Sequence, residues 1–221
     1  MSYLVHCILR NGLAAAPAEG ADGVRLVASG NLAAAVTAFG EKEETSARLL
    51  AYESVVSALH ASCAVIPLRY GCVMDREARI GEMLDERRAE YEALLDRLED
   101  QVEIGLRVLW EAVPAAPDPS GRPGTTWLAG MRQRHSAASG LTGAEREWAG
   151  SLCAGLSDLY SGVNMEASEV KGSRVVSLYF LVARAVLLQF RGQLGRIVSG
   201  QGRRFLVSGP WPPYNFVGSA I

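Results

Sequence analysis

The chain has 221 residues, of which 49% are hydrophobic and 21% charged, and its formal net charge is -2. This balance is typical of a folded globular protein rather than a disordered one, and the length fits one large domain or two small ones. The slight negative charge leaves no surplus of basic residues to hold a phosphate backbone, so nucleic acid is not expected as a main partner.

Targeting signals are not expected. Residues 1–5 contain no basic stretch that would open a signal peptide, so we expect a cytoplasmic protein. The longest apolar stretch near the C-terminus, 175–190, is interrupted by polar residues and is shorter than the ~20 residues of a membrane-spanning helix. In a reducing cytoplasm the cysteines should be free thiols; they are Cys7, Cys63, Cys72 and Cys153.

The first hundred residues predict alternating strands and helices. Residues 3–9 and 24–28 are short apolar strand candidates, and 32–39 is a third, although its alanine triplet also favours helix. Apolar residues at spacings of three and four predict a helix from Gly40 to about Ser62. An apolar strand at 63–68 follows.

A second helix is expected next, capped by Asp75 and running to about Leu98. Residues 101–110 then alternate between apolar and polar side chains, which predicts a strand with one buried and one polar face. Strands and helices in this order indicate an α+β fold. A ferredoxin-like arrangement is expected for this first domain.

A linker is predicted where proline and glycine are densest, because neither residue continues a helix or strand well. We therefore expect a ferredoxin-like domain at 1–113, a linker at 114–125 and a second α+β domain at 126–221, each domain with its own sheet. In the second domain Thr142 and Glu145 form a capping box for a helix to about Tyr160. Its other expected elements are paired strands at 163–170 and 174–182, a helix at 184–199 and a last strand at 204–207.

Sequence motifs for chemistry are weak. His6 and Cys7 are neighbours in a predicted strand and would point to opposite faces, and no other set supplies four metal ligands. Phosphate-binding glycine loops and local nucleophile motifs do not occur. Glu103 and Arg107 share the polar face of strand 101–110, and with Arg69 they could frame a ligand or partner site. A solvated ion pair on that face is the alternative.

The C-terminal stretch 208–217 is rich in proline and aromatic residues. Proline fixes φ and removes backbone donors, so this segment should be extended and stiff. Trp211 and Tyr214 offer large amphipathic faces. The segment could close its own domain or serve as a docking patch for a partner.

Three stretches together carry a family resemblance. They are Tyr-Glu-Ser-Val-Val at 52–56 leading to Ala-Val-Ile-Pro-Leu-Arg-Tyr-Gly at 64–71, Val-Glu-Ile-Gly-Leu-Arg-Val at 102–108, and Gly-Pro-Trp-Pro-Pro-Tyr-Asn-Phe at 209–216. In order and spacing they resemble the GvpL/GvpF family of gas vesicle proteins, whose ending, Gly-Pro-Trp-Pro-Pro-Tyr-Ser-Phe, matches almost residue for residue. The departures from the family pattern include Leu68, Tyr70, Ile104 and Arg107.

The resemblance implies two α+β domains, the first ferredoxin-like, and an accessory protein of gas vesicle assembly rather than an enzyme. It implies binding to the hydrophobic shell protein GvpA and to other gas vesicle accessory proteins, in the cytoplasm and at the vesicle, with no cofactor, metal or membrane. The expected partner-binding residues are Arg69, Glu103, Arg107, Trp211 and Tyr214. Two alternatives stay open: a ferredoxin-like small-molecule-binding regulatory domain, and an enzyme acting at Arg69 and Glu103.

Overall fold

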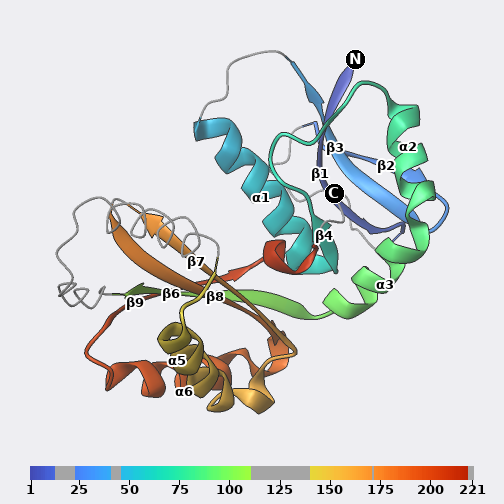
Figure 1. The fold of residues 1–221 in the computed structure, drawn as a ribbon. Coiled ribbons are helices and arrows are strands. Elements are labelled where there is room, and N and C mark those ends of the chain that lie inside the picture. Colours follow the sequence, from blue (N-terminus) through green and yellow to red (C-terminus); the bar gives the residue numbers. More distant parts are fainter. Residues whose placement is uncertain (13–22, 41–45, 111–139, 171, 219–221) are drawn as a thin grey trace. The chain divides into compact units, whose positions relative to one another are not determined.

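The structure, a computed structural model, describes residues 1–12, 23–40, 46–110, 140–170 and 172–218 (Figure 1). The chain divides into two compact units. Unit 1 comprises Met1–Glu103 together with Pro210–Ile221, and unit 2 comprises Ile104–Gly209. The chain therefore passes between the units twice, and the last residues return to the unit that contains the first.

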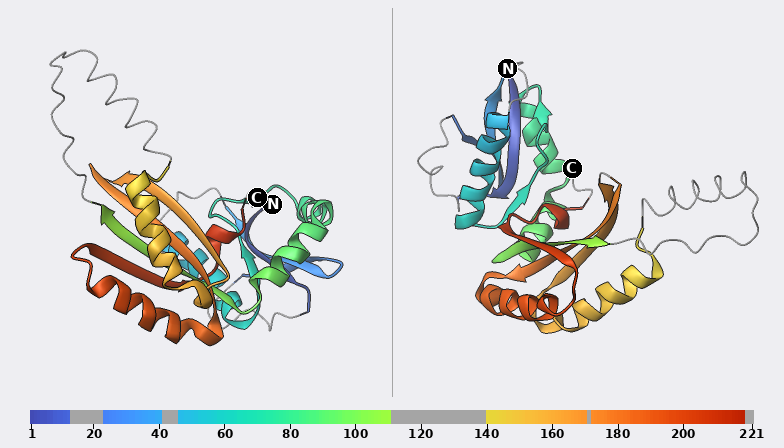
Figure 2. Two further views of the ribbon diagram at one scale, coloured as in Figure 1. Left: turned by 60° about the horizontal axis from the view of Figure 1, so that its bottom comes forward. Right: turned by 90° about the vertical axis from the view of Figure 1, so that its left-hand side faces the viewer.

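Unit 1 is built around a sheet with the strand order β2-β3-β1-β4, and β5 also pairs with β1. Its elements are β1 (Ser2–Arg10), β2 (Arg25–Ser29), β3 (Leu32–Phe39), α1 (Ser46–Ser62), β4 (Val65–Pro67), β5 (Val73–Met74), α2 (Glu77–Glu86) and α3 (Arg88–Leu98). Helix α1 lies on one face of the sheet, and α2 and α3 lie on the other (Figures 1 and 2). Because both faces are covered, every residue of β1 from 4 to 9 is buried.

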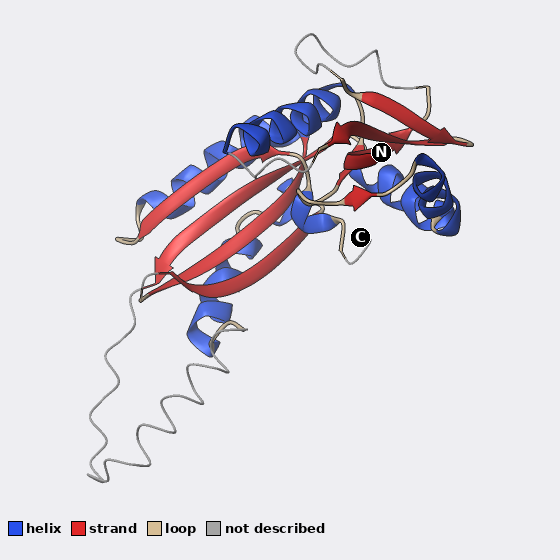
Figure 3. Cartoon of the chain, turned by 90° about the horizontal axis from the view of Figure 1, so that it is seen from above, coloured by secondary structure: helices blue, strands red, loops and turns tan. Residues whose placement is uncertain are grey.

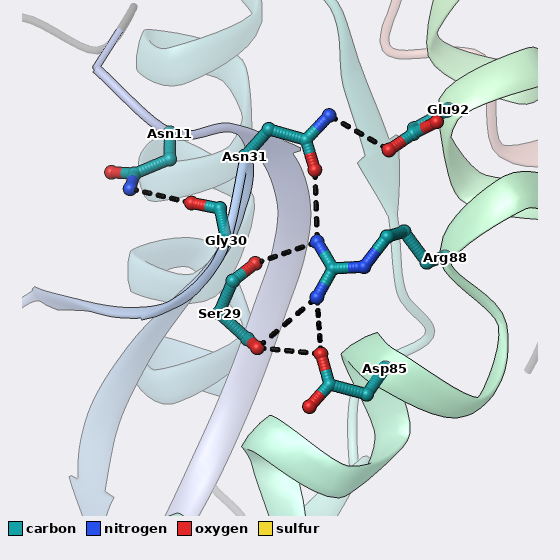
Figure 4. A network of polar contacts seen from close by, with 7 residues as sticks. All are labelled: Asn11, Ser29, Gly30, Asn31, Asp85, Arg88 and Glu92. Carbon is teal, nitrogen blue, oxygen red and sulfur yellow. Dashed lines mark hydrogen bonds and ion pairs between the residues drawn. The ribbon is translucent and has the colours of Figure 1, made fainter.

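A polar network fastens the β2–β3 turn to the helices (Figure 4). The Arg88 guanidinium donates to the Ser29 carbonyl at 3.0 Å and to the Asn31 side chain at 2.8 Å, and it forms an ion pair with Asp85. Asn31 donates in turn to Glu92 at 2.7 Å. Exposed pairs of this kind each contribute little, but together they fix the turn against α2 and α3.

Unit 2 holds a four-stranded sheet with the order β7-β8-β6-β9. Its elements are β6 (Gln101–Trp110), α5 (Gly143–Ala154), β7 (Gly162–Val170), β8 (Ser173–Ala183), α6 (Leu187–Ser199) and β9 (Arg204–Trp211), with 3-10 turns at Ser157–Leu159 and Arg184–Val186. The first residues of β6, 101–103, and the last residues of β9, 210–211, belong to unit 1. Helices α5 and α6 cover the same face of the sheet (Figures 1 and 3). The described elements follow the β-α-β-β-α-β order of a ferredoxin-like domain.

The domain assignment from sequence needs correction. Among the described elements, the ferredoxin-like order lies in unit 2, whereas those of unit 1 run β-β-β-α-β-β-α-α up to Leu98. Strand β6, expected in the first domain, belongs to the sheet that also contains β7 and β8, so one sheet includes strands from both sides of the expected linker. Periodicity identifies a strand but not its pairing partners, which are set by packing far along the chain. The expected linker, 114–125, lies outside the described residues.

The predictions made from local sequence patterns are partly confirmed by the structure. The hairpin of β7 and β8 is confirmed, with Val163 opposite Phe180. The capping box is confirmed by hydrogen bonds in both directions between Thr142 and Glu145. The helix expected from Asp75 to Leu98 is instead two helices: the chain bends at Arg87, which has φ -123 and ψ 23. Asp75 does not cap it, because the residue at the cap position of α2 is Arg76.

Candidate functional site

The tyrosines of two family-like stretches meet in one place in unit 1. Tyr52, from α1, belongs to the hydrophobic core cluster between α1 and the sheet. Tyr70, from the turn after β4, and Tyr214, from the C-terminal segment, pack against the same cluster. The rings of Tyr52 and Tyr70 meet edge to face, with 5.2 Å between their centroids. These residues therefore contribute to the fold of unit 1.

Glu103, in the second family-like stretch at 102–108, is bonded to the C-terminal segment. It was expected on a polar strand face, but only 4% of its surface is exposed. Its carboxylate accepts hydrogen bonds from the backbone N–H of Asn215 at 2.8 Å and from the Asn215 side-chain amide at 2.6 Å. Burial raises the pKa of the Glu103 carboxyl, and the two bonds from Asn215 offset part of that effect. Glu103 thus anchors the segment and is not a surface contact.

The C-terminal segment closes unit 1 after β9. Pro212, Pro213 and Phe216 are buried, and Arg97 donates a hydrogen bond to the Phe216 carbonyl. Tyr214 is half-buried, and burial raises the pKa of its hydroxyl. Residues 212–217, including Tyr214, therefore fit the interpretation in which the segment closes its own domain rather than serving as a docking patch.

The remaining predicted residues, Arg69, Arg107 and Trp211, are exposed. Arg69 lies in unit 1 and Arg107 in unit 2, and the Glu103 carboxylate accepts a hydrogen bond from the Asn215 amide. Trp211 ends strand β9, but 46% of its surface is exposed. Nearly half of the Trp211 surface is therefore open to solvent, so both interpretations of the segment stay open for this residue.

Strand β9 exposes apolar side chains that the sequence analysis did not single out. It lies at one end of the described sheet, and Leu206 is 59% and Val207 42% exposed. Neighbouring strand residues point to opposite faces, so the run Phe205-Leu206-Val207 could not be buried on one side only. That apolar run was the sequence signal from which an exposed apolar side chain on this strand could have been predicted. Exposed apolar side chains at a strand edge are typical of surfaces that bind other proteins.

Metal-binding clusters and membrane-spanning helices do not occur among the described residues. Histidine, cysteine, aspartate and glutamate do not gather there in groups of three or more that could hold a metal ion. None of the helices in the described ranges combines the length and apolarity needed to cross a membrane.

This geometry defines the class of protein: an α+β protein of two units, with exposed apolar side chains on a strand at one end of a sheet. The chain belongs to the GvpL/GvpF family: the family's sequence model, described as gas vesicle synthesis protein GvpL/GvpF, matches residues 2–218.

Two relatives are similar to this chain in sequence, and two solved structures share its fold. The chain is 27% identical to gas vesicle protein F of Streptomyces sp. (strain CB03234), covering 88% of this chain and 87% of the relative. It is 28% identical to gas vesicle protein L of the same strain, covering 77% and 68%. The crystal structure of GvpF from Anabaena sp. PCC7120 aligns with a TM-score of 0.72 at 17% identity, covering 98% of this chain and 95% of the other. That of GvpF from Microcystis aeruginosa gives 0.71 at 13% identity, covering 98% of each chain.

Proposed function

We propose that this protein is a cytoplasmic accessory protein of gas vesicle formation that binds the hydrophobic shell protein GvpA and acts with other gas vesicle proteins. The observation that carries the proposal is the family match over residues 2–218. A subunit that will line a gas-filled wall exposes apolar surface before assembly, and such surface aggregates. A soluble partner that covers this surface prevents the aggregation without any catalysis.

The proposed contact surface is β9, through Leu206, Val207 and Trp211, which are between 42% and 59% exposed. Apolar area removed from water contributes about 25 cal/mol per Å² before the costs of association. Arg69 and Arg107 are exposed and are proposed to influence orientation and association rate more than affinity.

Co-purification tests the proposal. The tagged protein is co-expressed with the shell protein, as wild type, as Leu206→Ser/Val207→Ser, and as the control Val170→Ser. Val170 is 52% exposed on β7, at the other end of the described sheet. We expect wild type and control to retain the shell protein and the β9 variant to lose it.

Deletion of the gene in a vesicle-forming strain, followed by electron microscopy, tests the role in the cell. We expect few or no vesicles, with rescue by the control but not by the β9 variant. Failure of the wild type to retain the shell protein under any condition would overturn the partner, and normal vesicles after deletion would overturn the role.

A further inference from the structure

A basic residue held by aromatic rings lies next to the exposed apolar residues of β9. Arg203 directly precedes the strand, and its guanidinium carbon lies 3.7 Å from the centre of the Trp110 ring and 5.9 Å from that of Trp148. Trp148 also stacks on Phe205, with 6.3 Å between the ring centroids, and its indole N–H donates a 2.7 Å hydrogen bond to Gln201. These contacts position the Arg203 side chain before any partner binds.

The Arg203 guanidinium is exposed, and within the described ranges it forms no ion pair or hydrogen bond. Stacking on an indole uses the face of a guanidinium, so its N–H groups, which lie in its plane, remain able to donate. A carboxylate can accept two parallel hydrogen bonds from such a group. Arg204 is exposed as well, and residues 203–211 include no acidic side chain. The charge at this end of β9 therefore suits an acidic group of a partner.

The exposed apolar residues of β9 indicate the form of that partner. Leu206 and Val207 are neighbours in the strand, so their side chains point to opposite faces of the sheet, and they are 59% and 42% exposed. A helix packed on one face would cover only one of them. A strand added beside β9 continues the sheet, contacts both side chains and pairs with the backbone groups of the open edge.

The part of β9 that can accept a strand is short. Strand β9 is last in the order β7-β8-β6-β9 of the described sheet. Its regular conformation is interrupted at Gly209, which has φ +105 and whose carbonyl accepts a hydrogen bond from Arg191. Pro210 follows and has no N–H to donate. Residues 204–208 remain, about the length of an average strand.

We propose that an extended partner segment adds as a strand to β9 along residues 204–208, with apolar side chains against Leu206 and Val207 and a carboxylate bound to Arg203. A second copy of this chain fits less well, because its β9 would bring arginine and no carboxylate. The inference rests on the proposed function for the identity of the partner, the shell protein. The form and charge of the partner segment come from β9 itself.

A hexapeptide probe tests the strand pairing. It alternates valine and serine, ends in glutamate and is blocked at both termini, so an antiparallel strand, the commoner kind, brings its carboxylate to Arg203. The control peptide has the same side chains but N-methyl groups on its backbone amides, so it cannot donate to a neighbouring strand.

Both peptides are titrated into isotope-labelled full-length protein and followed by NMR hydrogen exchange. At about ten times its dissociation constant the probe should slow exchange about tenfold at every second amide of 204–208, because only unbound protein exchanges there. Equal binding of the two peptides, or unchanged exchange along 204–208, would overturn the strand addition. The same alternate protection on raising the protein concentration alone would identify a second copy as the occupant and overturn the proposal.

A probe with glutamine in place of glutamate tests the role of Arg203. Wild type should bind the glutamate probe about fivefold more tightly, the upper range for an ion pair open to solvent. Arg203→Gln should lose this preference, whereas Arg196→Gln, the same change at an exposed position of α6, should keep it. An equal preference in the two variants would overturn the assignment to Arg203.

Co-purification of the same variants with the shell protein tests the partner. Retention should fall about fivefold with Arg203→Gln and remain with Arg196→Gln. If wild type binds the probe as expected but retains no shell protein, the proposed function fails and the strand-accepting edge stands. If wild type and Arg203→Gln retain the shell protein equally, the inference fails and the proposed function stands.

Discussion

At the scale of single residues, burial holds His6 neutral. Desolvation lowers the pKa of its imidazole from 6.5 to about 4, opposed in part by the Tyr52 backbone. The unfolded chain therefore binds one more proton than the folded chain between about pH 6.5 and pH 4, and stability falls as the pH falls through this window. A shift of this size corresponds to roughly 3 kcal/mol. Denaturant unfolding at several pH values should show that loss in wild type, and His6→Gln should lack about that much of it. Equal pH slopes would contradict this account.

Gly30 is a second residue whose identity matters. It sits in the β2–β3 turn with φ +58, a conformation that disfavours other residues, and a Cβ there would overlap the Arg88 guanidinium. Gly30→Ala should therefore destabilise unit 1 by about 1–3 kcal/mol, through backbone strain and displacement of Arg88.

Gly81 provides the control for that substitution. It lies inside helix α2, and a Cβ added there would meet no atom of another element within 4 Å, so Gly81→Ala should be neutral or stabilising by up to about 1 kcal/mol. Thermal unfolding should give a lower midpoint temperature for Gly30→Ala and an unchanged or higher one for Gly81→Ala. A neutral Gly30→Ala would show that the turn can rearrange around Arg88.

At the scale of elements, the sequence predicted what local patterns determine. The β7–β8 hairpin and the Thr142 capping box follow from alternation and from a four-residue motif, and both are present. The break at Arg87 was missed because the apolar stripe continues across it. The bulge at His6 was missed because it is defined only by the pairing of β1 with β3.

The candidate site was predicted less well than the helices and strands. Like the bulge, it depends on contacts between residues that are distant in the sequence. Glu103 reads as a polar-face residue from period two alone, but its burial depends on Asn215, which is distant in sequence. Of the family-like stretches, Tyr52, Tyr70 and Tyr214 pack in or against the core of unit 1. Exposure of Leu206 and Val207 depends on β9 being last in the strand order, which alternation does not reveal.

The C-terminal segment should contribute to stability through the bonds that Asn215 donates to Glu103. Asn215→Ala deletes the amide that donates to the buried Glu103 carboxylate, so we expect a loss of about 2–4 kcal/mol in unfolding free energy. Trp211→Ala should cost less than the 3–5 kcal/mol typical of a fully buried aromatic, because 46% of its surface is exposed.

Partner binding should rank these two variants in the opposite order. Trp211→Ala should weaken shell-protein binding by about 2 kcal/mol or more if Trp211 is a contact, while folded Asn215→Ala should bind nearly as wild type does. Chemical unfolding and a binding titration on the same samples separate the two effects. If Trp211→Ala loses much stability but binds the shell protein as wild type does, Trp211 stabilises the fold and does not contact the partner.

At the scale of the whole molecule, the prediction concerns the force that holds the partner. The protein carries a formal net charge of only -2, and the proposed contact residues Leu206, Val207 and Trp211 are apolar, so burial of apolar area should supply most of the affinity. Raising the salt concentration should therefore weaken capture of the shell protein only modestly. Arg69→Glu should slow association without unfolding the chain, because Arg69 is exposed. Pull-down and binding kinetics at low and high salt, with wild type and Arg69→Glu, measure both effects. Complete loss of binding at moderate salt would show an electrostatic complex instead, and would overturn the assignment of the contact to the apolar edge of β9.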